Sequence, residues 1–366
     1  MQEIIYVFLG ALALLFIARK VARKVGLVDK PNVRKHHNGH VPLVGGVSVY
    51  LSLWIIEALQ PGLLPDFPIY ISCASILLIV GIIDDRFDLP FLPRMLLQAL
   101  MACVMMWNGY YLYSLGNILF GSSLVLGVFG YAITLFAVIG AINAFNMVDG
   151  IDGLLGALSS VTFGALAVMF SVAGENNLAL WCTSLVVACL PYILLNLGIP
   201  WGRKFKVFMG DAGSTLIGFT VIWLLIVATQ GEKAVMQPIT ALWFIAIPLM
   251  DMSRVMISRI RRGFSPFRPD REHLHHLLQR SGLSGRATLA VIVSIALVMS
   301  LVGIVLSYEK LADLWQLLLF FVFYFGFSHV MKKLSYHEHQ RIEVGKNQLN
   351  DQVANEVDRT VSGLTK

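Results

Sequence analysis

The chain has 366 residues, of which 57% are hydrophobic and only 14% are charged. Soluble domains carry roughly a quarter charged residues, so this composition excludes an ordinary soluble protein and predicts an integral membrane protein. A formal net charge of +6 would suggest a nucleic-acid partner for a soluble protein. Here the basic residues flank apolar runs, so we expect them to set the orientation in a lipid bilayer, and we expect no nucleic-acid partner.

Repeated apolar runs of about 17–22 residues have the length that a helix needs to cross a bilayer. We therefore expect an all-α bundle with about 11 membrane spans, formed by residues 1–331, and a polar tail over 332–366. The candidate spans are 4–18, 43–60, 67–83, 95–112, 123–142, 154–173, 178–196, 213–229, 238–257, 288–307 and 314–331.

The distribution of Lys and Arg predicts the orientation. Seven of these residues lie within 19–42, after the first apolar run. This order is wrong for a cleavable signal and places the following loop in the cytoplasm. With alternate loops assigned to the cytoplasm, all of the 28 Lys and Arg residues except Lys233 and Lys310 lie on that side. We therefore expect a multi-pass protein with its N-terminus outside and its C-terminus in the cytoplasm.

The stretch Asn143–Gly153 breaks this apolar pattern. Asn146, Asp149 and Asp152 are three apart, so they would share one face of a helix end. Ionisable groups at a membrane boundary are expensive to bury and indicate a functional site. The alternative for these residues is a solvated loop, but Gly150 and Gly153 expose the backbone beside each acid, which suits the close approach of a ligand.

Four further loops on the same predicted face carry acids, bases and histidines. They hold Lys35, His36, His37 and His40 after the first span; Asp84, Asp85 and Asp88 after the third; Asn196, Lys206, Phe208 and Asp211 around the loop after the seventh; and Asp251, Arg254, Arg259, Arg262, His273, His275 and His276 after the ninth. Five loops therefore bring polar side chains to one membrane face, which is typical of an active site at a membrane interface.

The mixture of residue types indicates the chemistry. Several carboxylates without cysteine ligands favour a hard divalent cation, Mg²⁺ or Mn²⁺, held by oxygen atoms and substrate phosphates. Arginine, lysine and histidine side chains suit an anionic substrate with phosphate oxygens. Asp211 precedes the eighth span, whose helix N-terminus would carry partial positive charge toward an anion. Together these groups predict phosphoryl transfer.

Each cluster also has a simpler interpretation. The histidines at 36, 37 and 40 could be solvated loop residues, and the run Arg259–Arg262 could be a positive-inside anchor alone. A zinc site at His273, His275 and His276 lacks a cysteine or a sequence-paired acid to complete it. From another functional class, the alternative is a membrane transporter of an anionic solute. Transporters usually place their sites near the bilayer midplane, whereas these acids lie at span ends.

Four motifs together resemble the polyprenyl-phosphate N-acetylhexosamine-1-phosphate transferases. They are Asp84-Asp85-x-x-Asp88, Asn146-x-x-Asp149-Gly-x-Asp152-Gly, Phe208-Met-Gly-Asp211-x-Gly-Ser214 and His273-x-His275-His276, in this order within residues 35–280. The stretch Ser265–His273 is similar to the bacterial branch that uses UDP-N-acetylglucosamine (UDP-GlcNAc). The stretch Val41–Gly46 differs from the Thr-Pro-Thr sequence of the peptidoglycan branch, which argues against a MurNAc-pentapeptide substrate.

The resemblance implies roles for individual residues. Asp211 would bind Mg²⁺, while Asp84, Asp85, Asp149 and His273 would be catalytic. The substrate-binding residues would be Lys35, Asp88, Asn146, Asp152, Asn196, Phe208, Arg259, His275 and His276. Among these, Phe208 would stack on uracil with Asp152 near the uracil edge. The loop that contains His273 would cover the sugar and the diphosphate.

The resemblance also implies a reaction. GlcNAc-1-phosphate would pass from UDP-GlcNAc to undecaprenyl phosphate with release of UMP, as the first membrane step of O-antigen or enterobacterial common antigen type glycans. The location would be the bacterial inner (cytoplasmic) membrane. We expect direct attack by the lipid phosphate, which Asp84 would position or deprotonate, and a covalent aspartyl-phosphate route stays open. A homodimer and the choice between Mg²⁺ and Mn²⁺ also stay open.

Overall fold

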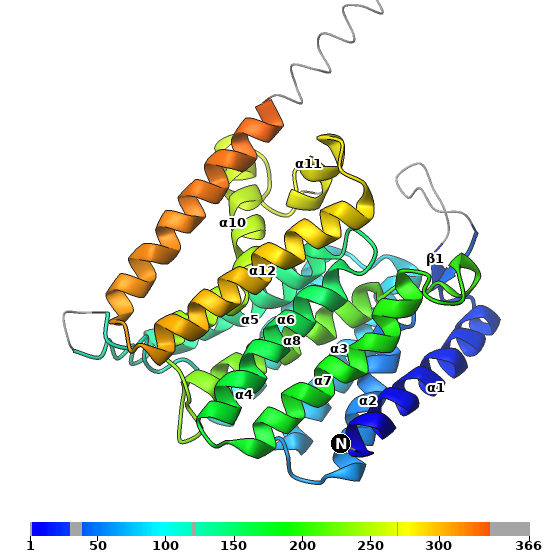
Figure 1. Cartoon of the computed structure of the whole chain (residues 1–366), viewed down its shortest axis with the longest axis horizontal. Helices are drawn as coiled ribbons and strands as arrows, with labels where there is room; N and C mark the ends of the chain where they lie inside the picture. The colour runs from blue at the N-terminus through cyan, green and yellow to red at the C-terminus, as the bar shows by residue number, and fades with distance from the viewer. Residues whose placement is uncertain (1, 30–38, 119–121, 269, 337–366) are drawn as a thin grey trace, which may run out of the picture.

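The computed structural model describes residues 2–29, 39–118, 122–268 and 270–336, which form a bundle of helices (Figure 1). In chain order the elements are α1 (Gln2–Val25), β1 (Val28–Asp29), β2 (Val41–Pro42), α2 (Gly45–Leu59), α3 (Phe67–Phe87), α4 (Phe91–Trp107), α5 (Phe129–Val148), α6 (Leu154–Val172), α7 (Asn176–Asn196), a short 3-10 helix (Arg203–Phe205), α8 (Gly210–Thr229), α9 (Pro238–Phe244), α10 (Ala246–Arg261), α11 (Leu274–Arg280) and α12 (Gly285–Tyr308). A last helix spans Asp313–Tyr336. The only sheet among the described residues is the antiparallel pair β1–β2.

The all-α polytopic class is confirmed, but not every expected span is a full-length helix. Eight of the described helices are long and apolar enough to cross a membrane, or nine if the bent pair α9–α10 counts as one. The candidate spans 43–60 and 95–112 are the shorter apolar helices α2 and α4, of 15 and 17 residues. The number of spans therefore stays a prediction.

The candidate span 238–257 is wrong as a single straight helix, because α9 and α10 meet at an angle of 85°. Pro248, in the first turn of α10, has no N–H to donate to the carbonyl of Phe244. That carbonyl instead accepts a hydrogen bond from Thr162 Oγ1 of α6 at 2.9 Å. A backbone break at membrane depth is tolerated when such a group is satisfied inside the protein.

Helix α8 lies at the centre of the bundle and is buried along nearly its whole length. It packs against α2, α3, α5 and α6. Small residues allow the close approach: a side chain at Gly46 of α2 would overlap the backbone of Gly213 in α8. Interfaces of this kind are typical of helices packed in membranes. Residues at the start of α8 are thereby held in fixed positions relative to α2.

Two helices continue beyond the apolar runs that predicted them. Helix α3 ends at Phe87, so Asp84 and Asp85 lie in its last turn and not in the following loop. Helix α5 ends at Val148, so Asn146 is helical and Asp149 directly follows the helix. The last helix also continues past the predicted domain end at residue 331, and residues 337–366 of the predicted tail lie outside the described part of the chain.

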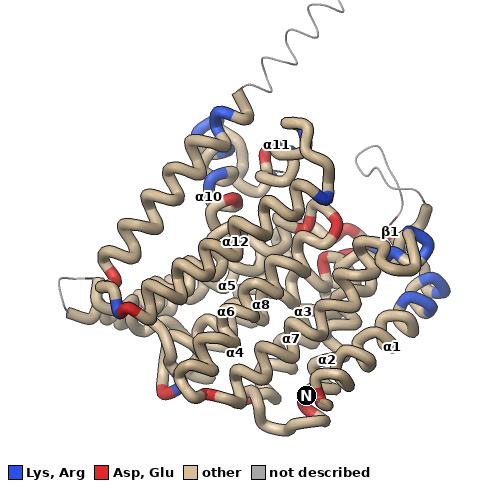
Figure 2. The backbone as a smooth tube through the Cα atoms, in the orientation of Figure 1, with Lys and Arg blue, Asp and Glu red and all other residues tan. Residues whose placement is uncertain are grey.

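Charged residues are concentrated at one end of the bundle (Figure 2). This end carries α11, β1, the last residues of α1 and the last turn of α3, and we call it the polar end. Lys and Arg gather there on α1, α10 and α11, with acidic residues between them. The polar clusters that lie in the described residues therefore come together in space, as expected for a site at a membrane interface.

Candidate active site

The two adjacent carboxylates in α3 have different surroundings. Asp84 is 4% exposed and accepts hydrogen bonds from Arg94 Nη1 at 2.6 Å and from one backbone N–H. Asp85 accepts hydrogen bonds from the backbone N–H groups of Asp211 and Ala212, at 2.7 and 3.2 Å. Those N–H groups lie in the first turn of α8, where they have no partner within the helix. Asp85 therefore caps α8, and its charge lies at the positive end of the helix dipole.

Asp211 is the carboxylate around which the other acids gather. Asn146 of α5 donates from Nδ2 to Asp211 Oδ1 at 2.7 Å and so fixes the orientation of this carboxylate. The charge of Asp211 acts on Asp84, Asp85 and Asp149. Helices α3, α5 and α8 thus bring four acids into one region of the polar end.

The acids fit one mode of divalent-cation binding. Within the ranges that the structure describes, no three His, Cys, Asp or Glu side chains lie close enough to hold a metal ion by themselves. Mg²⁺ in phosphoryl-transfer sites keeps several waters and is held by one or two carboxylates together with substrate phosphates. A single oriented carboxylate, Asp211, with further carboxylates beside it meets this requirement.

Asp149 follows α5 in the loop that leads to α6. Asp149 is exposed at the surface, and the protein around its carboxyl group still removes part of the hydration of that group. This burial raises the pKa of Asp149 to about 7, and the charges of Asp211 and Asp152 add to the effect. The group therefore titrates near neutral pH, which is typical of catalytic carboxylates.

Asn196 joins two loops at the site. It is 2% exposed, accepts a hydrogen bond from the backbone N–H of Gly153, and donates from Nδ2 to the carbonyl of Val207 at 2.8 Å. The first loop carries Asp152 and the second carries Phe208. Replacement of this buried amide would leave polar backbone groups unpaired, at a cost of about 1–3 kcal/mol each. Asn196 is expected to bind substrate, and in the structure it holds the loop of Asp152 and the loop of Phe208 together.

The loop after α10 places His273 against Asp251. His273 Nδ1 lies 2.8 Å from Asp251 Oδ2, and Asp251 Oδ1 accepts from the backbone N–H of Leu274 at 2.9 Å. Arg254 Nη2 lies 3.5 Å from the same Oδ1. Asp251 and His273 are 1% and 7% exposed. A carboxylate on Nδ1 fixes the imidazole orientation and directs Nε2 outward as an acid or a base, the arrangement that general acid–base catalysis uses.

His275 and His276 lie on α11 and are not positively charged at neutral pH. Burial, together with the charge of His276, lowers the pKa of His275 to about 3. Burial and the charge of His273 lower the pKa of His276 to about 4. His275 packs so closely against Gly150 that a side chain at residue 150 would overlap its Nε2. His275 therefore joins the α11 segment to the loop that carries Asp149, and neither histidine can attract phosphate by its charge.

Arg259, in the last turn of α10, and Arg262, directly after the helix, both hold the following loop. Arg259 is 2% exposed and donates to Asp270 Oδ2 at 2.7 Å and to the carbonyl of Pro266 at 2.5 Å. Arg262 forms a two-pronged ion pair with Glu272, at 2.6 and 2.8 Å. Arg262 is therefore paired within its own loop, and a role as a positive-inside anchor stays a prediction. Arg259, expected near the substrate, is enclosed by its own loop.

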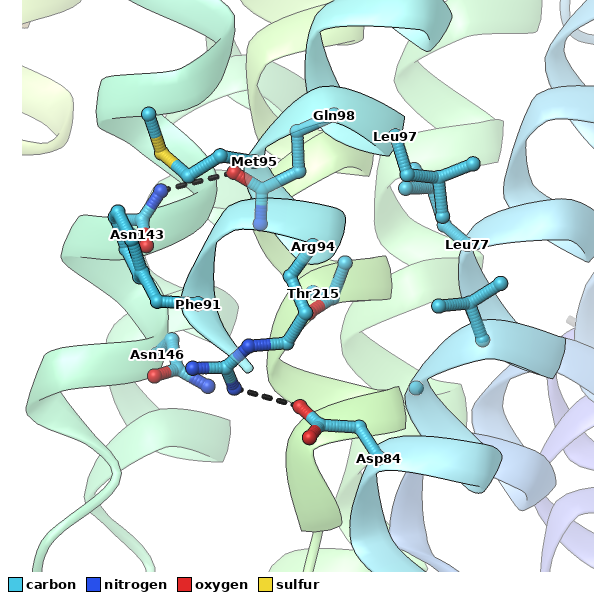
Figure 3. A pocket seen from close by; sticks show the side chains of 12 residues that line it. Leu77, Asp84, Phe91, Arg94, Met95, Leu97, Gln98, Asn143, Asn146 and Thr215 are labelled. Atoms are coloured by element: carbon cyan, nitrogen blue, oxygen red, sulfur yellow. Dashed lines mark hydrogen bonds and ion pairs between the residues drawn. The ribbon is translucent and has the colours of Figure 1, made fainter. Parts of the chain in front are cut away.

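A pocket opens beside Asp84, between α3, α4, α5 and α8 (Figure 3). In this view the Arg94 guanidinium points to Asp84, and Asn143 points to Gln98, whose Oε1 accepts from Asn143 Nδ2 at 2.9 Å. The apolar lining consists of Leu77, Val80, Gly81, Phe91, Met95 and Leu97. The outer face of α4 exposes Leu92, Leu96 and Leu100. The pocket therefore joins an apolar wall to a guanidinium–carboxylate pair, a combination that suits an amphipathic anion.

The structure brings most of the expected site residues to the polar end. Asp88 is exposed after α3, with its backbone N–H bonded to the carbonyl of Asp84, and Lys35 lies outside the described residues. Arg94 and Lys206 have no role predicted from the sequence, and the sequence indicates Asp251 as a polar loop residue but not as part of the site. Arg94 follows Asp84 by ten residues, but its pairing with that carboxylate depends on the turn between α3 and α4.

The fold and the site define a multi-pass helical membrane protein with a cluster of carboxylates at one end of its bundle. The model of Glycosyl transferase family 4 matches residues 67–229, which include Asp84, Asp149 and Asp211. The chain belongs to this family.

Several curated relatives are similar over almost the whole chain and have the same name, undecaprenyl-phosphate alpha-N-acetylglucosaminyl 1-phosphate transferase. The protein from Yersinia pestis is 51% identical over 88% of this chain and 88% of its own length. The protein from Escherichia coli strain K12 is 50% identical over 90% of each chain. The protein from Haemophilus influenzae is 46% identical over 91% of this chain and 95% of its own.

Proposed function

We propose that this protein transfers GlcNAc-1-phosphate from UDP-GlcNAc to undecaprenyl phosphate, forming undecaprenyl-diphospho-GlcNAc and UMP. The names of the relatives support the acceptor and the transferred group. The observation in the structure that carries the proposal is the pocket beside Asp84, where an apolar wall meets a guanidinium–carboxylate pair next to the cluster of acids. A lipid phosphate needs both environments in one place.

The acceptor would enter through the pocket between α4 and α5. Its isoprenoid chain would contact the apolar wall and the leucines that are exposed on the outer face of α4. Its phosphate would reach Arg94, whose planar guanidinium suits phosphate oxygens. Arg94 also neutralises Asp84, so that an anion can approach this carboxylate without facing an uncompensated negative charge.

The donor would lie on the side of Asp211 that is opposite to the acceptor pocket. Asp211, oriented by Asn146, would hold Mg²⁺, or Mn²⁺ in its place, and the ion when bound would supply positive charge to the diphosphate. The uracil would stack on Phe208 with Asp152 at its edge. The α11 segment, with His273 directed by Asp251, would cover the sugar and the diphosphate.

In the proposed reaction, an acceptor phosphate oxygen attacks the β-phosphorus of the donor. The bond from that phosphorus to the bridging oxygen breaks, and the electron pair leaves with UMP. A phosphate monoester has its second pKa near 6, so much of the acceptor is dianionic at neutral pH and needs no strong base. Asp84 is held by Arg94 and a backbone N–H, which favours a positioning role over a covalent aspartyl-phosphate.

The polar end would face the cytoplasm, where the nucleotide sugar is available, and the bilayer would be the bacterial inner membrane. All but two of the Lys and Arg residues lie in the loops assigned to that side.

A transporter of an anionic solute is the alternative function, and one experiment separates the two. The purified protein in detergent micelles, which enclose no compartment, receives UDP-GlcNAc with a radiolabelled sugar, undecaprenyl phosphate and Mg²⁺. The proposal predicts that label enters the butanol-extractable lipid and that UMP forms in equal amount. A transporter would leave all label in the aqueous phase.

A further inference from the structure

A second pocket opens at the end of the bundle opposite to the polar end. It lies where α12 ends and the last helix begins, beside the end of α8 and the loop that joins α4 to α5 (Figure 1). Its volume of about 820 Å³ lies in the range of about 300–1,000 Å³ that is typical of ligand pockets. The two pockets have no lining residue in common, so this one is separate from the candidate active site.

Asp313 gives this pocket its chemistry. The residue is 3% exposed, and its Oδ2 accepts a hydrogen bond from the backbone N–H of Asn117 at 2.5 Å. Within the described part of the chain, no second group donates to this carboxylate and no Lys, Arg or His is paired with it. A buried carboxylate without an opposite charge is unfavourable. The pocket therefore favours a cationic ligand.

A second acceptor lies beside this carboxylate. A side chain at Gly116 would overlap both Asp313 Oδ2 and Gln237 Oε1, so the two oxygens converge on the space that this glycine leaves free. Gly116 has a φ of +82°, which other residues rarely adopt. Converging acceptors suit a donor with several N–H groups, and a primary ammonium group carries three.

Hydrogen bonds hold the walls of the pocket in place. Gln230, at the end of α8, accepts from the backbone N–H groups of Tyr113 and Ser114 and donates to the carbonyl of Ser114. Gln316, in the first turn of the last helix, donates to the carbonyl of Leu311 at 2.8 Å. The acceptors are thus positioned before a ligand binds, which lowers the cost of binding.

The rim of the pocket is apolar. Val125 and Leu311 line the pocket and have exposed side chains, and Trp315, between two lining residues in the chain, is also exposed. The two helices whose ends meet here, α12 and the last helix, are candidate membrane spans. Tryptophan is enriched where membrane spans reach the lipid headgroups. The opening therefore lies at the level of the headgroups, close to the acyl chains.

We propose that this pocket binds the headgroup of a phospholipid that carries a primary ammonium group, of the phosphatidylethanolamine class. The ammonium group would donate to Asp313 and Gln237. Lys310, which lines the pocket and is exposed, would contact the phosphate. The acyl chains would lie against exposed apolar side chains of α12 and the last helix, such as Val305 and Val322.

The same groups discriminate against other phospholipids. The trimethylated ammonium of phosphatidylcholine has no N–H, so it would leave the oxygens of Asp313 and Gln237 without hydrogen bonds, and unpaired buried acceptors are costly. Phosphatidylglycerol has a net negative charge and no ammonium group, so it would bring a like charge toward Asp313. The pocket should therefore prefer phosphatidylethanolamine to both.

Native mass spectrometry of the full-length protein, freed of lipid in detergent, tests this proposal. Dioleoyl phosphatidylethanolamine, phosphatidylcholine and phosphatidylglycerol are titrated separately, and a Kd is obtained for each. Wild type is expected to bind phosphatidylethanolamine about tenfold more tightly than the other two lipids. Asp313→Asn keeps the volume of the side chain and an acceptor for the N–H of Asn117, but it removes the charge, so the preference should disappear.

Glu309→Gln is the matched control, because Glu309 is an exposed acid four residues away that does not line the pocket. This variant should keep the preference of wild type. Thermal unfolding shows whether each variant is folded. If Asp313→Asn does not fold, Gln237→Leu takes its place, since it removes the second acceptor at an exposed position and should reduce the preference several-fold.

Loss of the preference in the pocket variant, with its retention in Glu309→Gln, supports the proposal. Equal binding of the three lipids by wild type overturns it, as does an unchanged preference in the folded pocket variant. Glycerophosphoethanolamine, which has the same headgroup without acyl chains, is added as a competitor. If it displaces the lipid at equal concentration, the pocket recognises a soluble amine and the proposal of a lipid site is overturned.

Discussion

The pair of Asp251 and His273 gives a sharp prediction about the chemistry. The Asp251→Asn variant keeps the side-chain volume but removes the charge that lies 2.8 Å from His273 Nδ1. The backbone N–H of Leu274 donates to the other oxygen of Asp251 at 2.9 Å, so the amide oxygen of the variant would stay there. The amide NH₂ would then face the imidazole. His273 Nδ1 would have to accept a hydrogen bond, and the proton would move to Nε2.

The expected loss can be estimated from the geometry. Asp251 is 1% exposed, so solvent does not screen its interaction with His273. A hydrogen bond to a charged group contributes about 1.5–3 kcal/mol, which corresponds to a kcat lower by about ten- to a hundredfold. The assay is the rate at which labelled sugar phosphate enters the lipid phase. KM for UDP-GlcNAc should change much less than kcat, because the loss concerns the direction of one proton.

The matched control is Asp66, which directly precedes α3 at the end of that helix opposite to Asp84 and Asp85. Asp66 accepts a hydrogen bond from Tyr110 at 2.6 Å, far from the polar end, so Asp66→Asn should leave kcat unchanged. The reasoning would be refuted by Asp251→Asn protein that unfolds like wild type and also keeps the wild-type kcat.

Three further predictions concern the acids and the basic loop. Asp211→Asn should abolish transfer at every Mg²⁺ concentration, because an amide lacks the charge that a hard cation requires. If the variant is as active as wild type in a Mg²⁺ titration, Asp211 is excluded as the ligand. Arg262→Ala should reduce activity no more than a few-fold, since exposed ion pairs contribute about 0–1 kcal/mol. Arg259→Ala should lower both activity and unfolding temperature, because Arg259 is buried in its loop. Equal effects of the two variants would contradict this distinction. The kcat/KM of wild type should rise as pH increases through about 7, where Asp149 with its raised pKa becomes ionised. The Asp149→Asn variant should lose this rise and keep only the titration of the acceptor phosphate near pH 6. Identical pH profiles of the two proteins would show that Asp149 does not titrate in the reaction.

Hydropathy predicts the positions of the helices because membrane spans need long apolar runs. It fails at their ends. Asp84 and Asp85 lie inside α3 because Arg94 and the first turn of α8 satisfy their charges, so the helix continues beyond its apolar part. Hydropathy also does not show the bend between α9 and α10, where Pro248 leaves the carbonyl of Phe244 without its helical partner and Thr162 of another helix donates to it.

The candidate site could be predicted as a set of residues but not as a set of contacts. The motif acids are close in sequence to helix ends, so their arrival at one face follows from the topology. The partner of each acid depends on how helices pack, and this is why Arg94, Asp251 and Lys206 had no predicted role. His275 is expected to bind substrate, and its burial keeps it neutral, so such a contact would depend on hydrogen bonding and not on charge.

The fate of the β-phosphate tests the central claim most directly. The purified protein receives UDP-GlcNAc with radioactive phosphorus at the β-position, together with undecaprenyl phosphate and Mg²⁺. Transfer of a sugar phosphate predicts that the radioactive phosphorus enters the lipid and that the nucleotide product is unlabelled UMP. If the lipid acquires sugar but the label stays in UDP, the protein transfers only the sugar and the account is contradicted.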